Sequence, residues 1–173
     1  LDREAIVLVT ADHGEEFHEH GRWGHGKSLY DEVVRVPLVM AGPGVLEGTE
    51  VQAPVMLVDV LPTLATLVEP ADATDAAGTA INDDPGREAY AELIREGGIE
   101  HYMLVADERK YLESRDRLGE AMREELYDLA EDPAESRNLA APTAGASPVE
   151  RWSRRLTELR SGAAARRVET TQT

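Results

Sequence analysis

Apolar runs separated by polar loops mark the first forty residues. The run Ile6-Val7-Leu8-Val9 ends at a polar segment and predicts a buried strand over residues 4–10. A second apolar run predicts a strand over residues 36–41. Between them, glycine and histidine predict a loop over residues 11–27, followed by a short helical turn over residues 28–34 with Ser28 as its N-cap. In open α/β sheets ligands bind beyond the carboxyl ends of strands, so the loop is the candidate site.

The middle of the chain carries one helical pattern. Apolar residues recur at intervals of three and four over residues 54–68, which predicts a helix. Pro62 falls inside this pattern and is expected to kink or divide the helix. Residues 69–85 are rich in Ala, Asp, Thr and Gly and are expected to form a loop with little apolar surface to bury.

Short strand patterns follow. Residues 101–105 and 109–113 flank Asp107-Glu108, which predicts a hairpin. Residues 87–96 fit a helix or a strand, and a strand over residues 89–93 is favoured; a further strand is expected over residues 125–129. The chain therefore continues with an antiparallel β region.

The last part of the chain changes in composition. Small residues over 142–148 predict a linker, and the pattern from Val149 to about Arg160 predicts a helix. The tail carries six arginines and two acids over residues 151–173, opposite in sign to the rest. We expect three parts: a core over 1–85, a small antiparallel β subdomain over 86–141, and a linker with an Arg-rich helix and tail over 142–173.

Charge narrows the classes of partner. The 173 residues have a formal charge of −16, with 34 acidic against 18 basic side chains. Such a surface repels nucleic acid and anionic membranes, so neither is expected as a partner. Lys27 and Lys110 are the two lysines, and an acidic, lysine-poor surface suits salt-rich cells. A halophilic source is one hypothesis, and an ordinary acidic protein is the other.

Two absences in the sequence bear on chemistry and location. There is no cysteine, hence no disulfide, thiolate zinc site or cysteine nucleophile within this chain. No apolar run approaches the ~20 residues of a membrane span, and the start shows no signal-peptide pattern. The compartment stays unknown, with a cytoplasmic location favoured. The beginning at Leu1, without Met, indicates a piece of a longer chain.

Histidines concentrate in the loop after the first strand. Four of the five, all but His101, lie there. Imidazole together with carboxylate suits a divalent cation or a phosphate-like oxyanion. A solvated loop without function and a structural metal loop are the alternatives, although the latter normally includes cysteine.

Ordered motifs in the chain resemble one family. The sequence Val9-Thr10-Ala11-Asp12-His13-Gly14-Glu15, then Gly24-His25-Gly26 and Arg35-Val36-Pro37-Leu38, resembles the C-terminal half of a sulfatase of the alkaline phosphatase superfamily. Three later segments agree with it in the same order: Val58-Asp59-Val60-Leu61-Pro62-Thr63-Leu64, Arg109-Lys110-Tyr111, and Glu125-Leu126-Tyr127-Asp128-Leu129 with the residues to Leu139. The resemblance covers about residues 4–140.

This resemblance implies a fold and a site. The fold class is α/β: the C-terminal part of an alkaline-phosphatase-like α/β/α core plus a small antiparallel β subdomain with a C-terminal helix. Asp12 and His13 stand where the family binds its divalent cation, with calcium expected and magnesium, manganese or zinc as alternatives. His25 matches the residue that binds the sulfate or protonates the leaving group, and Lys27 is a second substrate-binding candidate. His20 is either a substrate contact or a loop-structuring residue. Gly14 is expected to let the backbone turn sharply.

The resemblance also implies what this chain lacks. The family's nucleophile, a formylglycine made from Cys or Ser in a Cys/Ser-x-Pro-x-Arg motif, belongs to the N-terminal half, and nothing here matches it. We therefore expect a sulfuric ester hydrolase acting on a sulfated small molecule or carbohydrate, completed by the missing N-terminal half and inactive alone. A phosphodiesterase, phosphonate hydrolase or phosphoethanolamine-type transferase of the same superfamily is the alternative. A non-catalytic module that binds metal or a partner is another.

Overall fold

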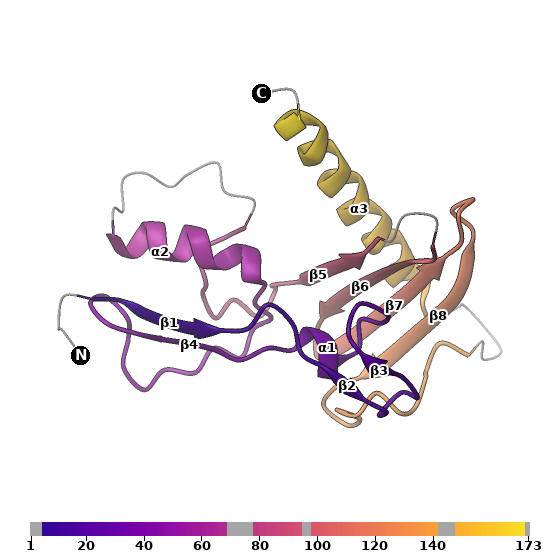
Figure 1. The fold of residues 1–173 in the computed structure, drawn as a ribbon, viewed down its shortest axis with the longest axis horizontal. Coiled ribbons are helices and arrows are strands. Elements are labelled where there is room, and N and C mark those ends of the chain that lie inside the picture. The colour runs from indigo at the N-terminus through magenta and orange to yellow at the C-terminus, as the bar shows by residue number, and fades with distance from the viewer. Residues whose placement is uncertain (1–4, 69–77, 95–97, 142–147, 172–173) are drawn as a thin grey trace. The chain divides into compact units, whose positions relative to one another are not determined.

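The computed structural model describes residues 5–68, 78–94, 98–141 and 148–171 (Figure 1). The chain forms two compact units, residues 1–25 with 30–89 and residues 26–29 with 90–173. The described residues of the first unit form two pairs of short strands, a 3-10 turn and two helices: β1 (Val7–Thr10), β2 (Glu16–Phe17), β3 (Trp23–Gly24), α1 (Asp31–Val34), β4 (Leu38–Ala41), η1 (Leu57–Asp59) and α2 (Val60–Val68). The second holds β5 (Ala89–Leu93), β6 (Glu100–Ala106), β7 (Arg109–Arg115), β8 (Ala121–Asp128) and α3 (Glu150–Thr171).

Strands β1 and β4 form a two-stranded antiparallel sheet in which Val7 pairs with Ala41 and Val9 with Val39. Both strands were expected from their apolar runs, and both are present. The prediction that the first strand is buried is wrong: Val9 is 57% exposed and Val39 60% exposed. The physical reason is that a pair of strands has too few neighbours to cover its apolar side chains.

The helices begin later than the sequence pattern suggested. Tyr30, not Ser28, is the residue before α1, and no side chain caps that helix. The helical pattern from residue 54 begins as η1 and continues as α2 from Val60. Pro62 is the third residue of α2 and so lies in its first turn, where a missing N–H leaves no bond within the helix unmade. Helix α2 therefore runs through Pro62 without the expected division, and the change from 3-10 turn to α-helix lies before it, at Val60.

A fully buried aspartate at the end of η1 joins this turn to the segment that follows α2. The Oδ2 atom of Asp59 accepts hydrogen bonds from the Met56 amide at 2.8 Å and from Nη2 of Arg87 at 2.6 Å. Its Oδ1 atom accepts from the Thr79 amide at 2.9 Å. Arg87 also donates to the Pro54 carbonyl at 3.0 Å and to the Ala80 carbonyl at 3.3 Å. Asp59 and Arg87 thus neutralise each other while joining distant parts of the first unit.

The second unit is built on a four-stranded sheet in the order β5-β6-β7-β8. The predicted hairpin is confirmed: β6 pairs antiparallel with β7, from Glu100 with Arg115 to Ala106 with Arg109. Asp107 and Glu108 form its turn with φ values of 50° and 56°, the left-handed geometry that matches the twist of paired strands. Strand β8 pairs antiparallel with β7 and begins at Ala121, earlier than the predicted residue 125.

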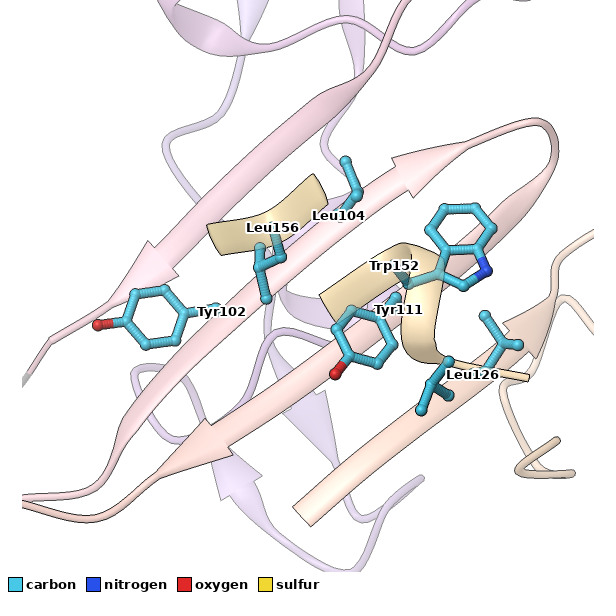
Figure 2. Packing of buried hydrophobic residues seen from close by; sticks show 7 residues of the cluster. Tyr102, Leu104, Tyr111, Leu126, Trp152 and Leu156 are labelled. Atoms are coloured by element: carbon cyan, nitrogen blue, oxygen red, sulfur yellow. The ribbon is translucent and has the colours of Figure 1, made fainter. Parts of the chain in front are cut away.

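Helix α3 covers one face of this sheet. Trp152 and Leu156 lie over the strands, as Figure 2 shows, and Leu156 is fully buried. The sheet contributes apolar side chains from three strands to the same cluster: Tyr102, Leu104, Tyr111 and Leu126. The helix was expected to end near Arg160, and it continues to Thr171.

Polar contacts fix α3 on the sheet as well. The guanidinium group of Arg160 lies 3.9 Å from the Tyr102 ring centroid and donates a 3.0 Å hydrogen bond to the Tyr102 hydroxyl. The hydroxyl of Ser153 donates to Oε2 of the buried Glu113 at 3.3 Å. Burial raises the pKa of Tyr111, so this hydroxyl stays protonated and donates to Glu124 at 2.6 Å.

The residues after β8 are also held to the sheet. Lys110 on β7 forms an ion pair with Glu135, its Nζ 2.9 Å from Oε1, and neither side chain is exposed beyond 1%. The Asn138 side chain accepts a hydrogen bond from the Leu126 amide at 3.0 Å and donates to the Glu124 carbonyl at 3.1 Å. The segment that follows β8, up to Asn138, thus packs against β7 and β8.

Several expectations fall partly outside the described residues, namely the loop over 69–85 and the linker over 142–148. The expected domain boundaries near residues 85 and 141 stay predictions. Among the helices that the structure describes, none is long and apolar enough to cross a membrane.

Candidate functional site

The candidate site lies where β1 ends and a small hairpin begins. Asp12 and His13 follow β1 directly. Strands β2 and β3 then pair Glu16 with Gly24 and Phe17 with Trp23, so the chain returns to the level of Glu15. This hairpin brings His25 back beside the residues that follow β1.

Asp12 and His13 present their donor atoms to a common side. Nδ1 of His13 lies 2.8 Å from the Gly14 carbonyl oxygen, which only accepts, so Nδ1 carries the proton. In the neutral ring Nε2 therefore keeps its lone pair, and it lies 3.7 Å from Oδ2 of Asp12. The other carboxylate oxygen, Oδ1, accepts the His13 amide at 3.0 Å and holds the Asp12 side chain in place.

His25 joins this pair through its ring. The imidazoles of His13 and His25 are stacked, with centroids 3.8 Å apart and planes inclined by 29°. Nδ1 of His25 lies 3.3 Å from Oε2 of Glu15, so the carboxylate holds the proton on Nδ1 and orients the ring. Both side chains are well exposed, 51% for His25 and 40% for Glu15. Residues twelve positions apart in the sequence thus form one cluster with Asp12.

Gly14 is required for a reason other than the expected one. It is absent from the residues with positive φ, so it does not provide a left-handed turn. A Cβ atom at this position would lie 2.1 Å from the Glu32 carbonyl oxygen, and the Gly14 amide donates to the Val33 carbonyl at 2.7 Å. The glycine therefore allows the site loop to lie directly against α1.

The other two candidate residues are His20 and Lys27. Nδ1 of His20 donates to Oε1 of Glu32 at 2.7 Å, and its ring stacks on Tyr30 with centroids 3.6 Å apart. These contacts hold the hairpin turn against α1, the loop-structuring role considered for His20. Lys27 is exposed and belongs to the second unit.

The donor set suits a divalent cation but is small. A carboxylate oxygen and an imidazole lone pair 3.7 Å apart can address one hard or borderline cation. Across the described residues, no group of three or more His, Cys, Asp or Glu side chains is arranged to hold a metal ion. Asp12 and His13 therefore fit a metal as two of its ligands.

Sequence reasoning missed Glu15 and the hairpin itself. Two-residue strands are too short to produce a periodic pattern. The spacing Glu15-Glu16-Phe17 against Trp23-Gly24-His25, symmetric about a turn containing Gly21, was the available signal.

Comparison with known proteins agrees with the motifs. The model of the Sulfatase family matches residues 1–70. Arylsulfatase K of Mus musculus is 31% identical over 155 residues, which is 81% of this chain and 28% of that protein. The Delta 4,5-hexuronate-2-O-sulfatase of Bacteroides thetaiotaomicron is 29% identical over 148 residues, 80% of this chain and 31% of that protein.

The fold comparison points the same way. A solved structure from work on the metabolism of multiple glycosaminoglycans by Bacteroides thetaiotaomicron aligns with a TM-score of 0.55 and 18% identity. It covers 80% of this chain and 33% of that chain, which confirms the expected α/β fold class. The chain thus spans about a third or less of the proteins that it matches. With the ordered motifs, these similarities confirm the resemblance: this chain is similar to a segment of the sulfatases.

Proposed function

We propose that this chain supplies part of the catalytic centre of a metal-dependent sulfatase, which hydrolyses a sulfate ester to an alcohol and sulfate. The observation that carries the proposal is the cluster of Asp12, His13 and His25, which the hairpin assembles from two segments. The match to the Sulfatase family model supports the reaction class, and the names of the relatives support a sulfated aryl or carbohydrate substrate.

In this proposal Asp12 and His13 hold a divalent cation through a carboxylate oxygen and Nε2. Calcium is the proposed ion, because Asp12 offers a hard oxygen, and magnesium, manganese and zinc are the alternatives. When bound, the cation neutralises charge on the sulfuryl oxygens. The His13 ring is already oriented for this task by its bond to the Gly14 carbonyl.

His25 acts on the substrate. With Nδ1 held by Glu15, its Nε2 is directed to a substrate oxygen, either a non-bridging sulfuryl oxygen or the oxygen of the departing alcohol. Both roles require a proton on Nε2, since each is a hydrogen bond or proton donated to a substrate oxygen. Lys27 and His20 are further substrate-binding candidates, and formylglycine is the proposed nucleophile in the polypeptide that completes the fold.

Metal binding to the chain itself gives the first test. Manganese(II) broadens the NMR signals of nearby nuclei, so Mn2+ should broaden the His13 and Gly14 signals first. Asp12→Ala should abolish the selective broadening, whereas Glu47→Gln, an exposed change elsewhere, should leave it intact. Equal broadening in the Asp12→Ala variant would contradict the metal assignment.

Turnover gives the second test. The chain alone should hydrolyse 4-nitrophenyl sulfate no faster than buffer, because it carries no nucleophile motif. Within the full sulfatase polypeptide, His25→Ala should lower kcat by about a hundredfold or more. If His25 protonates the alcohol, the loss should be larger for an alkyl sulfate than for 4-nitrophenyl sulfate, whose leaving group needs little protonation. An unchanged kcat for both substrates would contradict the role of His25.

A further inference from the structure

An exposed aromatic cluster stands on the hairpin beside the candidate site. Phe17 on β2 is 63% exposed and Trp23 on β3 is 62% exposed, although both are large apolar side chains. Their rings meet edge to face with centroids 6.0 Å apart, and the His18 ring lies nearly parallel to the indole at 6.2 Å. These three residues form what we call the hairpin platform. Exposed apolar side chains gathered in this way mark a binding surface more often than scattered ones do.

The hairpin platform is adjacent in sequence to the cluster of Asp12, His13 and His25, where we propose that the sulfate binds. Trp23 lies two residues from His25, so their Cα atoms are no more than about 7 Å apart. Phe17 is likewise two residues from Glu15, which orients the His25 ring. A sulfate ester held at His25 therefore places the ring of its alcohol part within reach of these aromatic side chains.

The backbone holds the hairpin platform in a fixed form. The buried Glu16 carboxylate accepts hydrogen bonds from the amides of His20 at 3.2 Å and Arg22 at 2.7 Å, which closes the hairpin turn. His18 has a φ of 85°, an unfavourable conformation for a residue with a side chain, and the surrounding turn maintains it. A backbone that is ordered before a ligand arrives loses little conformational freedom on binding.

We propose that the hairpin platform, Phe17, His18 and Trp23, binds the face of a six-membered ring in the alcohol part of the sulfate ester. The shared chemistry is a flat, weakly polar ring face against aromatic rings, which a pyranose or an aryl group provides. The inference rests on the proposed function, because it takes the sulfate position from His25. It makes Trp23 a residue that determines which alcohol the site accepts.

The indole N–H signal of Trp23 in the NMR spectrum reports on this contact directly. The chain has two tryptophans, and Trp152 is buried in the other unit, so Trp23→Phe assigns the signals. N-acetylglucosamine 6-sulfate and phenyl sulfate are the two probes, with inorganic sulfate and methyl sulfate as ligands that lack a ring. Both ring-bearing esters should shift the Trp23 signal, and the stronger of the two identifies the ring type.

Variants separate the hairpin platform from the sulfate position. Trp23→Ala should weaken binding of the preferred ester by about two- to tenfold, and leave inorganic sulfate unaffected. Trp23→Phe keeps a ring and should retain most of the affinity, and the thermal midpoint should barely move in either variant because the side chain is exposed. His25→Ala should weaken every sulfated ligand, including inorganic sulfate.

The outcomes have distinct meanings. Sulfate binding that depends on His25, with ring-bearing and ring-free esters bound equally, would overturn the hairpin platform and leave the proposed function standing. Ring binding that depends on Trp23 but not on sulfate or His25 would support a ring-binding surface and contradict the proposed sulfate position. If no probe shifts the Trp23 signal, the proposal is wrong.

Discussion

Replacing Asp59 by alanine tests whether the first unit depends on its buried ion pair. Asp59 is fully buried and accepts three hydrogen bonds, and the side chain of its partner Arg87 is only 9% exposed. Alanine leaves the guanidinium charge inside without a counterion and two amides without an acceptor. Breaking a buried pair in this way costs about 3–5 kcal/mol, a large part of the stability of a small unit.

Amide hydrogen exchange of α2 measures this cost in the right unit. A loss of 3 kcal/mol raises the opening constant by about a hundredfold, so the α2 amides should exchange faster by that factor. Asp83→Ala is the matched control, since Asp83 also accepts two backbone amides, from Gln52 at 2.9 Å and Ala53 at 3.1 Å, but is exposed. It should cost about 1–2 kcal/mol.

The reasoning is refuted if both aspartate variants accelerate exchange equally. Asp59→Asn keeps the test informative if Asp59→Ala does not fold. Its side-chain amide keeps one acceptor oxygen, so the loss of stability should be smaller than in Asp59→Ala. Asp59→Ala should destabilise a chain that already carries Arg87→Ala by less than it destabilises the original chain, since no charge is then left unpaired.

Four further expectations concern packing, charge and pH. Leu156→Ala should lower the free energy of unfolding by about 2–5 kcal/mol in urea titrations followed by tryptophan fluorescence, whereas an unchanged midpoint would show that α3 is not held by its core contact. Gly14→Ala should separate the site loop from α1, because its Cβ would lie 2.1 Å from the Glu32 carbonyl oxygen, and Mn2+ broadening at the site should weaken in parallel. The Arg137 amide, followed by the Ser136 hydroxyl, lowers the pKa of Asp132, so its stabilising effect is complete above the ordinary pKa of 3.8 and is lost as pH falls through the lowered value. An NMR titration should place that midpoint below 3.8, and a midpoint at or above it would contradict the hydrogen bonds. Raising salt from about 0.1 to 1 M shortens the screening length from roughly 10 to 3 Å and should raise the thermal midpoint of this chain of formal charge −16, with a fall counting against self-repulsion.

The local sequence pattern was sufficient to predict the elements in which that pattern is clear. The Asp107-Glu108 hairpin and the helix from residue 150 were predicted because their strand and helix patterns are clear, whereas the segment of β5 fitted a helix as well as a strand. The exposure of Val9 could not be predicted. An apolar run indicates that a strand has apolar side chains to bury, but not whether other elements are present to bury them. The β2–β3 hairpin was missed because its strands have two residues each.

The candidate site was likewise predictable only in part. Asp12, His13 and His25 were identified from motifs, and the structure brings the two imidazoles into contact. The role of Glu15 depends on the register of the hairpin, whose only signal in the sequence was the symmetric spacing of residues 15–17 and 23–25. The motif identified Gly14, but the reason for a glycine there could not be predicted. The reason is the close approach of the site loop to α1, which only the three-dimensional structure shows.

The buried ion pair of Lys110 has a practical consequence for chemical labelling. The sequence contains two lysines, and the side-chain amine of Lys110 is fully enclosed against Glu135. Lys27, which is exposed, is therefore the side-chain amine that an amine-reactive dye reaches in the folded protein. A fluorophore attached there would report from a position two residues from His25, and unfolding would reveal itself as a second label on the same chain.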